Sequence, residues 1–119
     1  KKNLKDSLLV TGGPRGASKI KDKIFSEYIN VSNNVSNVRK FGSAALDMAY
    51  VACGRFDGYW QRELNYWDIA AGVIILKEAG GFIDFFEEDP NLPLKKNILA
   101  TNFNIHDELK ELIVKKDIE

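Results

Sequence analysis

The sequence predicts an α/β fold, a layered sheet with helices on its flanks. Short apolar runs of strand length alternate with longer segments of helical periodicity, and this alternation is typical of layered α/β domains. The 119 residues provide enough chain for one domain. Two of the expected helices lack a polar face, which indicates that protein beyond a single layered domain covers their outer sides.

The N-terminal third is expected to form a strand, a helix and a second strand. Residues 7–11 (SLLVT) form an apolar run that stops at the Gly-Gly-Pro of residues 12–14. Apolar residues recur at helical spacing across residues 18–29 with lysines between them, as on a surface helix with one buried side. The polar residues 30–37 predict a loop, and residues 38–41 a brief strand.

The middle of the chain is expected to hold the two apolar helices. Ser43 can cap the first of them, which runs to about Cys53 and meets a helix stop at Gly54. Residues 57–61 predict a turn followed by a strand. Residues 67–79 predict the second apolar helix, which ends at a Gly-Gly pair.

The C-terminal third is expected to return to the sheet and to end in a helix. Residues 82–86 are strand-like, residues 89–93 are loop-like, and residues 98–101 form the last strand. Asn104 can cap an amphipathic helix that carries Asp107 in its first turn. The apolar residues of this helix share one face: Ile105, Leu109, Leu112 and Ile113.

Charge and cysteine content narrow the class of protein. Lys plus Arg and Asp plus Glu number 17 each, so the formal net charge is zero. This balance offers no electrostatic basis for direct nucleic-acid binding or for binding to an anionic membrane. No run approaches the ~18 apolar residues that span a bilayer. The single cysteine, Cys53, excludes a disulfide within the chain and fits a cytoplasmic location.

The segment Trp67-Asp68-Ile69-Ala70-Ala71-Gly72 contains the most informative carboxylate. It places Asp68 in the first turn of an expected buried helix, where the helix dipole favours negative charge. The small residues that follow allow another group to approach the helix closely. From these residues alone, a capping aspartate followed by small packing residues is the plainer interpretation.

The same segment, followed by Glu78-Ala79-Gly80-Gly81, resembles the C-terminal signature of the inositol monophosphatase family. The resemblance covers nearly the whole chain, and its segments are in the family's order. Besides this signature they are L-L-V-T-G at 8–12, Arg39 with G-S-A-A-L-D at 42–47, G-R-F-D-G-Y-W at 54–60, and A-T-N at 100–102.

This resemblance implies the C-terminal half of the family's αβαβα sandwich and a metal-assisted phosphatase of the bacterial extragenic-suppressor type. Asp68 would bind a catalytic Mg²⁺ and lie near the substrate, a phosphate monoester of inositol or a related sugar or polyol. Gly42, Ser43 and Ala44 would contact the phosphorylated polyol at a second helix start. Arg39 would point toward the substrate. The resemblance also implies a homodimer.

Two departures from the family pattern affect the site. Gln61 stands where the family usually has a glutamate that accepts hydrogen bonds from sugar hydroxyls; an amide keeps the hydrogen bonding without the charge. The family's other metal carboxylates belong to an N-terminal half with a D-P-x-D-G-[ST] motif, and Asp57-Gly58 lacks the preceding D-P. We therefore expect the metal-binding N-terminal half to be absent from residues 1–119, and this segment alone to be inactive.

Two residue roles and two alternative functions remain open at this stage. His106, the only histidine, is expected to be solvated, and Asp47 is expected to pair with a buried Arg55 or Arg39. Two alternatives to an enzyme remain. One is a non-catalytic interaction module, because some relatives of the extragenic-suppressor type contact transcription machinery. The other is the folded remnant of a broken phosphatase gene.

Overall fold

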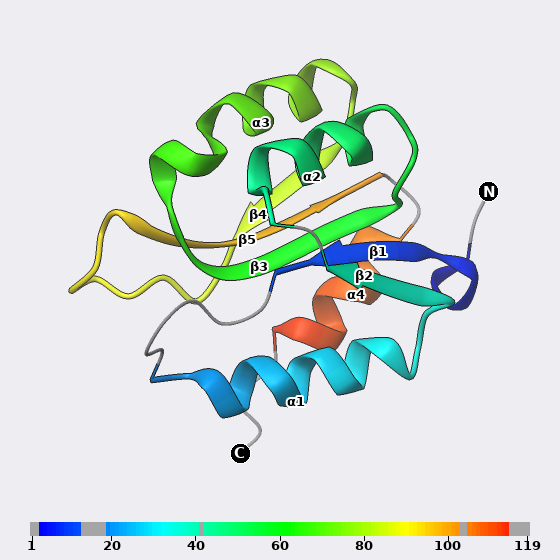
Figure 1. Ribbon diagram of the computed structural model, residues 1–119, viewed down its shortest axis with the longest axis horizontal. Helices are drawn as coiled ribbons and strands as arrows, with labels where there is room; N and C mark the ends of the chain where they lie inside the picture. The colour runs from blue at the N-terminus through cyan, green and yellow to red at the C-terminus, as the bar shows by residue number, and fades with distance from the viewer. Residues whose placement is uncertain (1–2, 13–18, 41, 103–104, 115–119) are drawn as a thin grey trace.

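A computed structural model describes residues 3–12, 19–40, 42–102 and 105–114. These residues form a five-stranded mixed sheet in the order β2-β1-β3-β5-β4, with helices on both faces (Figure 1). The predicted α/β class is therefore confirmed. After a short 3-10 turn at Leu4–Asp6, the elements in chain order are β1 (Leu8–Thr11), α1 (Lys21–Ser32), β2 (Asn37–Lys40), α2 (Ala44–Ala52), β3 (Gly58–Asn65), α3 (Tyr66–Glu78), β4 (Phe82–Phe85), β5 (Lys95–Thr101) and α4 (His106–Ile113).

The strand directions bring several chain segments to one edge of the sheet. Strand β1 runs parallel to both β2 and β3, with Val10 paired to Arg39 on one side and to Tyr59 on the other. Strand β5 runs antiparallel to β3 and β4. The carboxyl ends of β1, β2 and β3 therefore meet at one edge, and Figure 1 shows that α2 and α3 begin at this same edge. Crevices at such edges are the usual ligand sites of open α/β sheets.

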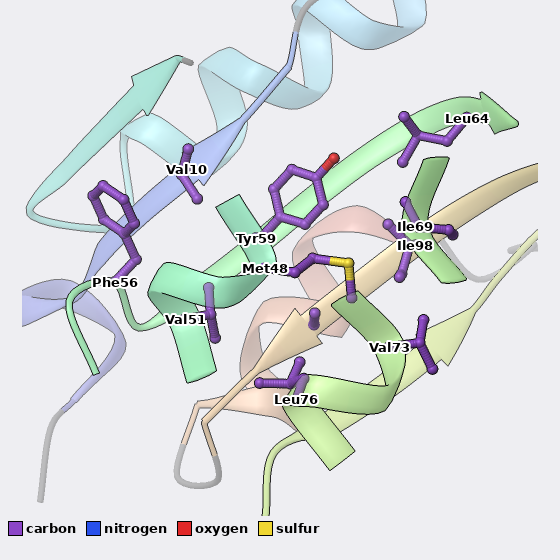
Figure 2. Close-up of a cluster of buried hydrophobic side chains, with 11 residues drawn as sticks. Val10, Met48, Val51, Phe56, Tyr59, Leu64, Ile69, Val73, Leu76 and Ile98 are labelled. Atoms are coloured by element: carbon purple, nitrogen blue, oxygen red, sulfur yellow. The ribbon is translucent and has the colours of Figure 1, made fainter. Parts of the chain in front are cut away.

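Alternation along the strands divides the core between two layers. Adjacent strand residues point to opposite faces, so Val10 and Tyr59 pack beneath α2 and α3 while Leu9 and Trp60 pack against α1 and α4. Figure 2 shows the first of these clusters, to which α2, α3 and the strands contribute side chains. Its buried members are Val10, Met48, Val51, Phe56, Tyr59, Leu64, Ile69, Val73, Leu76, Ile98 and Ala100.

Helices α2 and α3 pack closely against each other. A Cβ atom added at Gly72 would lie 2.9 Å from the Met48 sulfur, so the helices could not approach this closely with a larger residue there. Their outer side carries large exposed side chains: Trp67 is 64% exposed and Ile74 is 63% exposed. Both sides of these helices were predicted to be covered. Among the residues that the structure describes, only the side that faces the sheet is covered.

Several element boundaries differ from those predicted. Helix α1 continues to Ser32, through residues expected to form a loop, because Val31 is fully buried against the α1–α4 side of the sheet. Strands β3 and β5 are longer than predicted because they pair as far as Asn65 and Lys95. The predicted cap Asn104 lies outside the described residues. Within the described ranges, no helix combines the length and apolar character needed to cross a membrane.

Candidate active site

The start of α2 lies at the shared strand edge and has the predicted cap. Ser43 occupies the N-cap position, and its hydroxyl oxygen accepts a hydrogen bond from the Leu46 backbone N–H at 3.3 Å. Gly42 and Ser43 are exposed and Ala44, the first helical residue, is half-buried. An accessible helix start of this kind presents N–H groups and a positive dipole end, which favour an anion.

Asp68 lies at the start of the neighbouring helix. It is the third residue of α3 and is half-buried. Asn65 occupies the N-cap position of this helix, and Asp68 follows it at the third helical position. A carboxylate in the first turn is stabilised by the dipole.

Arg39 reaches the same edge from β2. It is the next-to-last residue of that strand, and its side chain is exposed. Strand β2 is the outermost strand on this side of the described sheet, so Arg39 lies beside the site rather than beneath it. The structure thus brings the predicted residues of β2, α2, β3 and α3 to one edge.

Gln61 lies on β3 and contacts the end of β1. It is 8% exposed, and its Oε1 accepts a hydrogen bond from the Tyr59 hydroxyl at 2.5 Å. A Cβ atom added at Gly12 would lie 2.4 Å from Cδ, Nε2 and Oε1 of Gln61. The amide therefore lies directly on the Gly12 backbone, and a larger residue at position 12 would have to displace it.

Strands β1 and β3 are also joined by a buried side-chain bond. The Thr11 hydroxyl donates to the Trp60 carbonyl oxygen at 2.5 Å, which fixes Gly12 beside Gln61. In the sequence, Gly12 marks the end of a strand and belongs with Thr11 and Tyr59 to the family-like segments, but no site role was predicted for these three residues. A glycine directly after a buried strand was the only available sign of this contact.

A bulge in β3 accompanies the site. The pairing with β5 shifts between Gln61 and Leu64, and Glu63 between them has φ +61°. Residues three apart in a regular strand would point to opposite faces. The bulge instead lets Leu64 join the same apolar cluster as Tyr59. The Asn97 side-chain oxygen accepts from the Glu63 N–H at 2.9 Å and supports the irregular backbone.

Asp47 is buried in the first turn of α2, and the expected arginine pairing is wrong. It is 1% exposed, and neither carboxyl oxygen has a hydrogen-bond partner among the described residues. Arg55 instead lies over the Tyr50 ring at 5.6 Å, and Arg39 is an exposed residue of the edge strand. Burial raises the pKa of the Asp47 carboxyl from 3.8 to about 6.

His106 is also placed differently from the expectation. Its side chain is only 12% exposed. Its Nδ1 lies 2.5 Å from the Thr101 hydroxyl and its Nε2 lies 2.6 Å from an Asp84 carboxylate oxygen. Burial acts to raise the pKa of Asp84, but hydrogen bonds from His106 and Lys110 hold it below its usual value. Thr101 is fully buried, so this relay ties α4 to β4 and β5 and offers no nucleophile to a substrate.

The described acidic residues do not complete a metal centre by themselves. Among residues 3–12, 19–40, 42–102 and 105–114, no three His, Cys, Asp or Glu side chains are grouped so that they could hold an ion. Mg²⁺ commonly takes one or two carboxylates together with waters and substrate oxygens. A half-buried carboxylate such as that of Asp68 is of the type that Mg²⁺ takes as one ligand.

Comparisons with known proteins show which sequences this chain resembles. The chain is 43% identical over 111 residues to an inositol-1-monophosphatase of Synechocystis, matching 93% of this chain and 39% of that protein. It is 37% identical over 124 residues to the Nus factor SuhB of Escherichia coli, matching 94% of this chain and 45% of that protein.

The chain also shares its fold with a protein of known crystal structure. The crystal structure of the extragenic suppressor protein SuhB from Bartonella henselae superimposes with a TM-score of 0.84 at 40% identity, over 98% of this chain and 45% of that one. The chain thus spans less than half the length of these relatives. The sequence model of the inositol monophosphatase family matches residues 1–117, and the chain belongs to that family.

Proposed function

We propose that this chain supplies the C-terminal part of the active site of a Mg²⁺-dependent phosphatase that hydrolyses a phosphate monoester of inositol or a related sugar or polyol. The observation that carries the proposal is the convergence of two helix starts, those of α2 and α3, at one strand edge that also holds Gln61. Family membership supports a phosphatase-like hydrolase in general.

In this proposal each residue at the edge has a distinct role. The exposed N–H groups near Gly42, Ser43 and Ala44 would hold oxygens of the phosphorylated polyol, since helix starts bind anions. Arg39 would add a positive charge beside the substrate. Asp68 would hold the divalent cation, which when bound neutralises phosphate charge and activates water.

We further propose that the remaining metal carboxylates belong to an N-terminal half of the protein, which covers the outer side of α2 and α3. Two observations support it. The relatives are more than twice as long as this chain. Large apolar side chains, among them Trp67 and Ile74, are exposed on that outer side, and soluble proteins rarely leave large apolar patches uncovered. By itself the segment should show no turnover. A cytoplasmic homodimer is the assembly we propose for the complete protein.

The test compares two variants of the complete protein, in which this chain is joined to its N-terminal portion. Asp68→Asn keeps the shape but removes the charge, so turnover should fall by orders of magnitude and recover in part at high Mg²⁺ concentration. Since Asn65 rather than Asp68 is the N-cap residue, the loss of the dipole interaction should lower the free energy of unfolding by roughly 0.3–1 kcal/mol. Asp68→Ala should lose activity without recovery. A fully active Asp68→Asn enzyme contradicts the proposal.

A non-catalytic interaction module is the second candidate. It is favoured by the similarity to relatives named Nus factor SuhB and by the exposed apolar side of α2 and α3. If the complete protein has no phosphatase turnover with Mg²⁺ but its cellular role survives Asp68→Asn, this second function is correct. A remnant of a broken gene would show neither property.

A further inference from the structure

We propose that Tyr59 is a positioning residue that fixes the amide of Gln61, so that the site presents the Gln61 NH₂ group as a donor to an oxygen of the substrate's polyol part. The inference rests on the proposed function, because it takes Gln61 to face that part of the substrate. It goes further by naming what sets the amide's direction and which substrates benefit.

The geometry restrains the amide on two sides. Tyr59 and Gln61 are two residues apart on β3, so both side chains lie on the same face of the sheet. The Tyr59 ring is fully buried beneath α2 and α3, and Figure 2 shows its hydroxyl pointing toward the carboxyl end of β3. The hydroxyl is 2.5 Å from Gln61 Oε1. On the other side the Gly12 backbone lies against the same amide.

This arrangement selects one of the two orientations of the amide. A glutamine amide carries an acceptor oxygen and two N–H donors. The Tyr59 hydroxyl donates its proton to Oε1, which directs Nε2 away from the phenol. Among the described residues Nε2 has no hydrogen-bond partner, so its N–H groups remain for a ligand. A rotated amide would bring its N–H groups to the phenol and present the oxygen instead.

The fixed orientation determines which substrate oxygen is recognised. A carboxylate at position 61 would only accept hydrogen bonds and would suit hydroxyls that donate. The restrained NH₂ group only donates, so it favours an oxygen that carries no proton, above all one that is charged. The substrate class that fits is a phosphorylated sugar acid, in which a carboxylate replaces one hydroxyl-bearing carbon of the polyol. One such hydrogen bond corresponds to a preference of about tenfold.

The experiment uses the complete protein and two matched substrates, phosphogluconate and sorbitol phosphate. The wild-type enzyme should prefer the sugar acid by kcat/KM. Tyr59→Phe keeps the ring but frees the amide to rotate, so the ratio of the two kcat/KM values should fall about tenfold, mainly through KM. Tyr50→Phe removes the hydroxyl of a half-buried tyrosine on α2 and should leave the ratio unchanged.

A second background separates positioning from simple structural support. Gln61→Glu replaces the donor with a carboxylate, which accepts in either orientation, and should reverse the preference toward sorbitol phosphate. Adding Tyr59→Phe to Gln61→Glu should then leave the ratio unchanged, because a carboxylate has no orientation to lose. If Tyr59→Phe lowers the ratio of the two kcat/KM values equally in the wild-type and Gln61→Glu backgrounds, its effect is structural. That result would overturn the positioning role of Tyr59.

The outcomes also separate this inference from the proposed function. If the wild-type enzyme hydrolyses both substrates but Tyr59→Phe does not change their ratio, the phosphatase function stands and the positioning role is wrong. If the complete protein hydrolyses no phosphorylated polyol or sugar acid at all, the proposed function is wrong and the positioning role falls with it.

Discussion

Gly12 illustrates how a single residue without a side chain can shape a binding site. Its backbone touches the Gln61 amide so closely that a Cβ atom would lie 2.4 Å from three of that side chain's atoms. The contact joins the end of β1 to the middle of β3, two segments that only the paired strands bring together. The identity of residue 12 and the position of Gln61 are therefore coupled.

Gly12→Ala should displace Gln61 and cost about 1–3 kcal/mol of stability, the usual range for an added methyl group in a packed region. In the complete enzyme, KM for the polyol phosphate should rise more than kcat falls. Thermal unfolding and steady-state kinetics measure the two effects. In a Gln61→Ala background the stability cost of Gly12→Ala should largely disappear, since the clashing amide is gone. An equal cost in both backgrounds would show that the added methyl group meets something else.

Asp47 should make the stability of the 119-residue chain dependent on pH. Its folded pKa of about 6 lies above the ordinary value of 3.8, so the folded state holds the proton more tightly than the unfolded state does. This stabilisation is complete below the unfolded pKa and is lost as pH rises through about 6, a change of roughly 3 kcal/mol. With Asp47→Asn, the denaturant midpoint should no longer change with pH between about pH 4 and pH 7. A wild-type chain that is equally stable across this range would contradict the prediction.

Strand β3 shows how an element can depart from regular geometry to serve a site. Glu63 adopts φ +61°, a region that costs an L-residue roughly 1–2 kcal/mol. The resulting bulge separates Gln61, which contacts the end of β1, from Leu64, which packs in the core. Strand β3 is therefore longer than the segment predicted at residues 57–61, and its backbone is strained at Glu63.

Glu63→Gly should therefore be more stable than Glu63→Ala by about 1 kcal/mol. Both variants remove the carboxylate and any contact that it makes, but only glycine relieves the backbone, so their difference isolates the strain. Chemical denaturation of the two variants measures it. If the alanine variant is as stable as the glycine variant, residue 63 stores no strain.

The molecule as a whole is covered unevenly. The α1–α4 layer buries a side of the sheet with ion pairs as well as apolar groups: Arg62 binds Glu27 at 2.8 Å with both side chains almost fully buried. The α2–α3 layer buries its inner side against the sheet but leaves apolar side chains exposed on its outer side. The zero net charge gives little protection against association through this side.

The isolated chain should therefore self-associate and bind a hydrophobic dye through the outer side of α2 and α3. Ile74→Lys, at a residue 63% exposed on α3, should reduce dye fluorescence and the apparent mass in light scattering. Ile29→Lys, at a residue 60% exposed on α1, is the matched control and should change neither. A monodisperse wild-type monomer that binds no dye would mean that the domain covers its own apolar surface.

The sequence by itself determined the features that depend on near neighbours in the chain. The Ser43 cap, the first-turn position of Asp68 and the glycine that follows α2 each involve residues a few positions apart. Local hydrogen bonding and helix periodicity fix such features. The family resemblance likewise rested on short linked motifs, and the match to residues 1–117 confirms it.

Only the tertiary structure decided the features that join distant segments. His106 was expected to be solvated, but its partners Thr101 and Asp84 come from two different strands. Asp47 was expected to pair with Arg55 or Arg39, yet within the described part of the chain neither of its carboxyl oxygens has a hydrogen-bond partner. The contact joins Gly12 to Gln61 across a stretch of chain that contains α1, β2 and α2. Strand order and helix packing set which side chains meet, and these arise from burial of the whole apolar surface rather than from any local pattern.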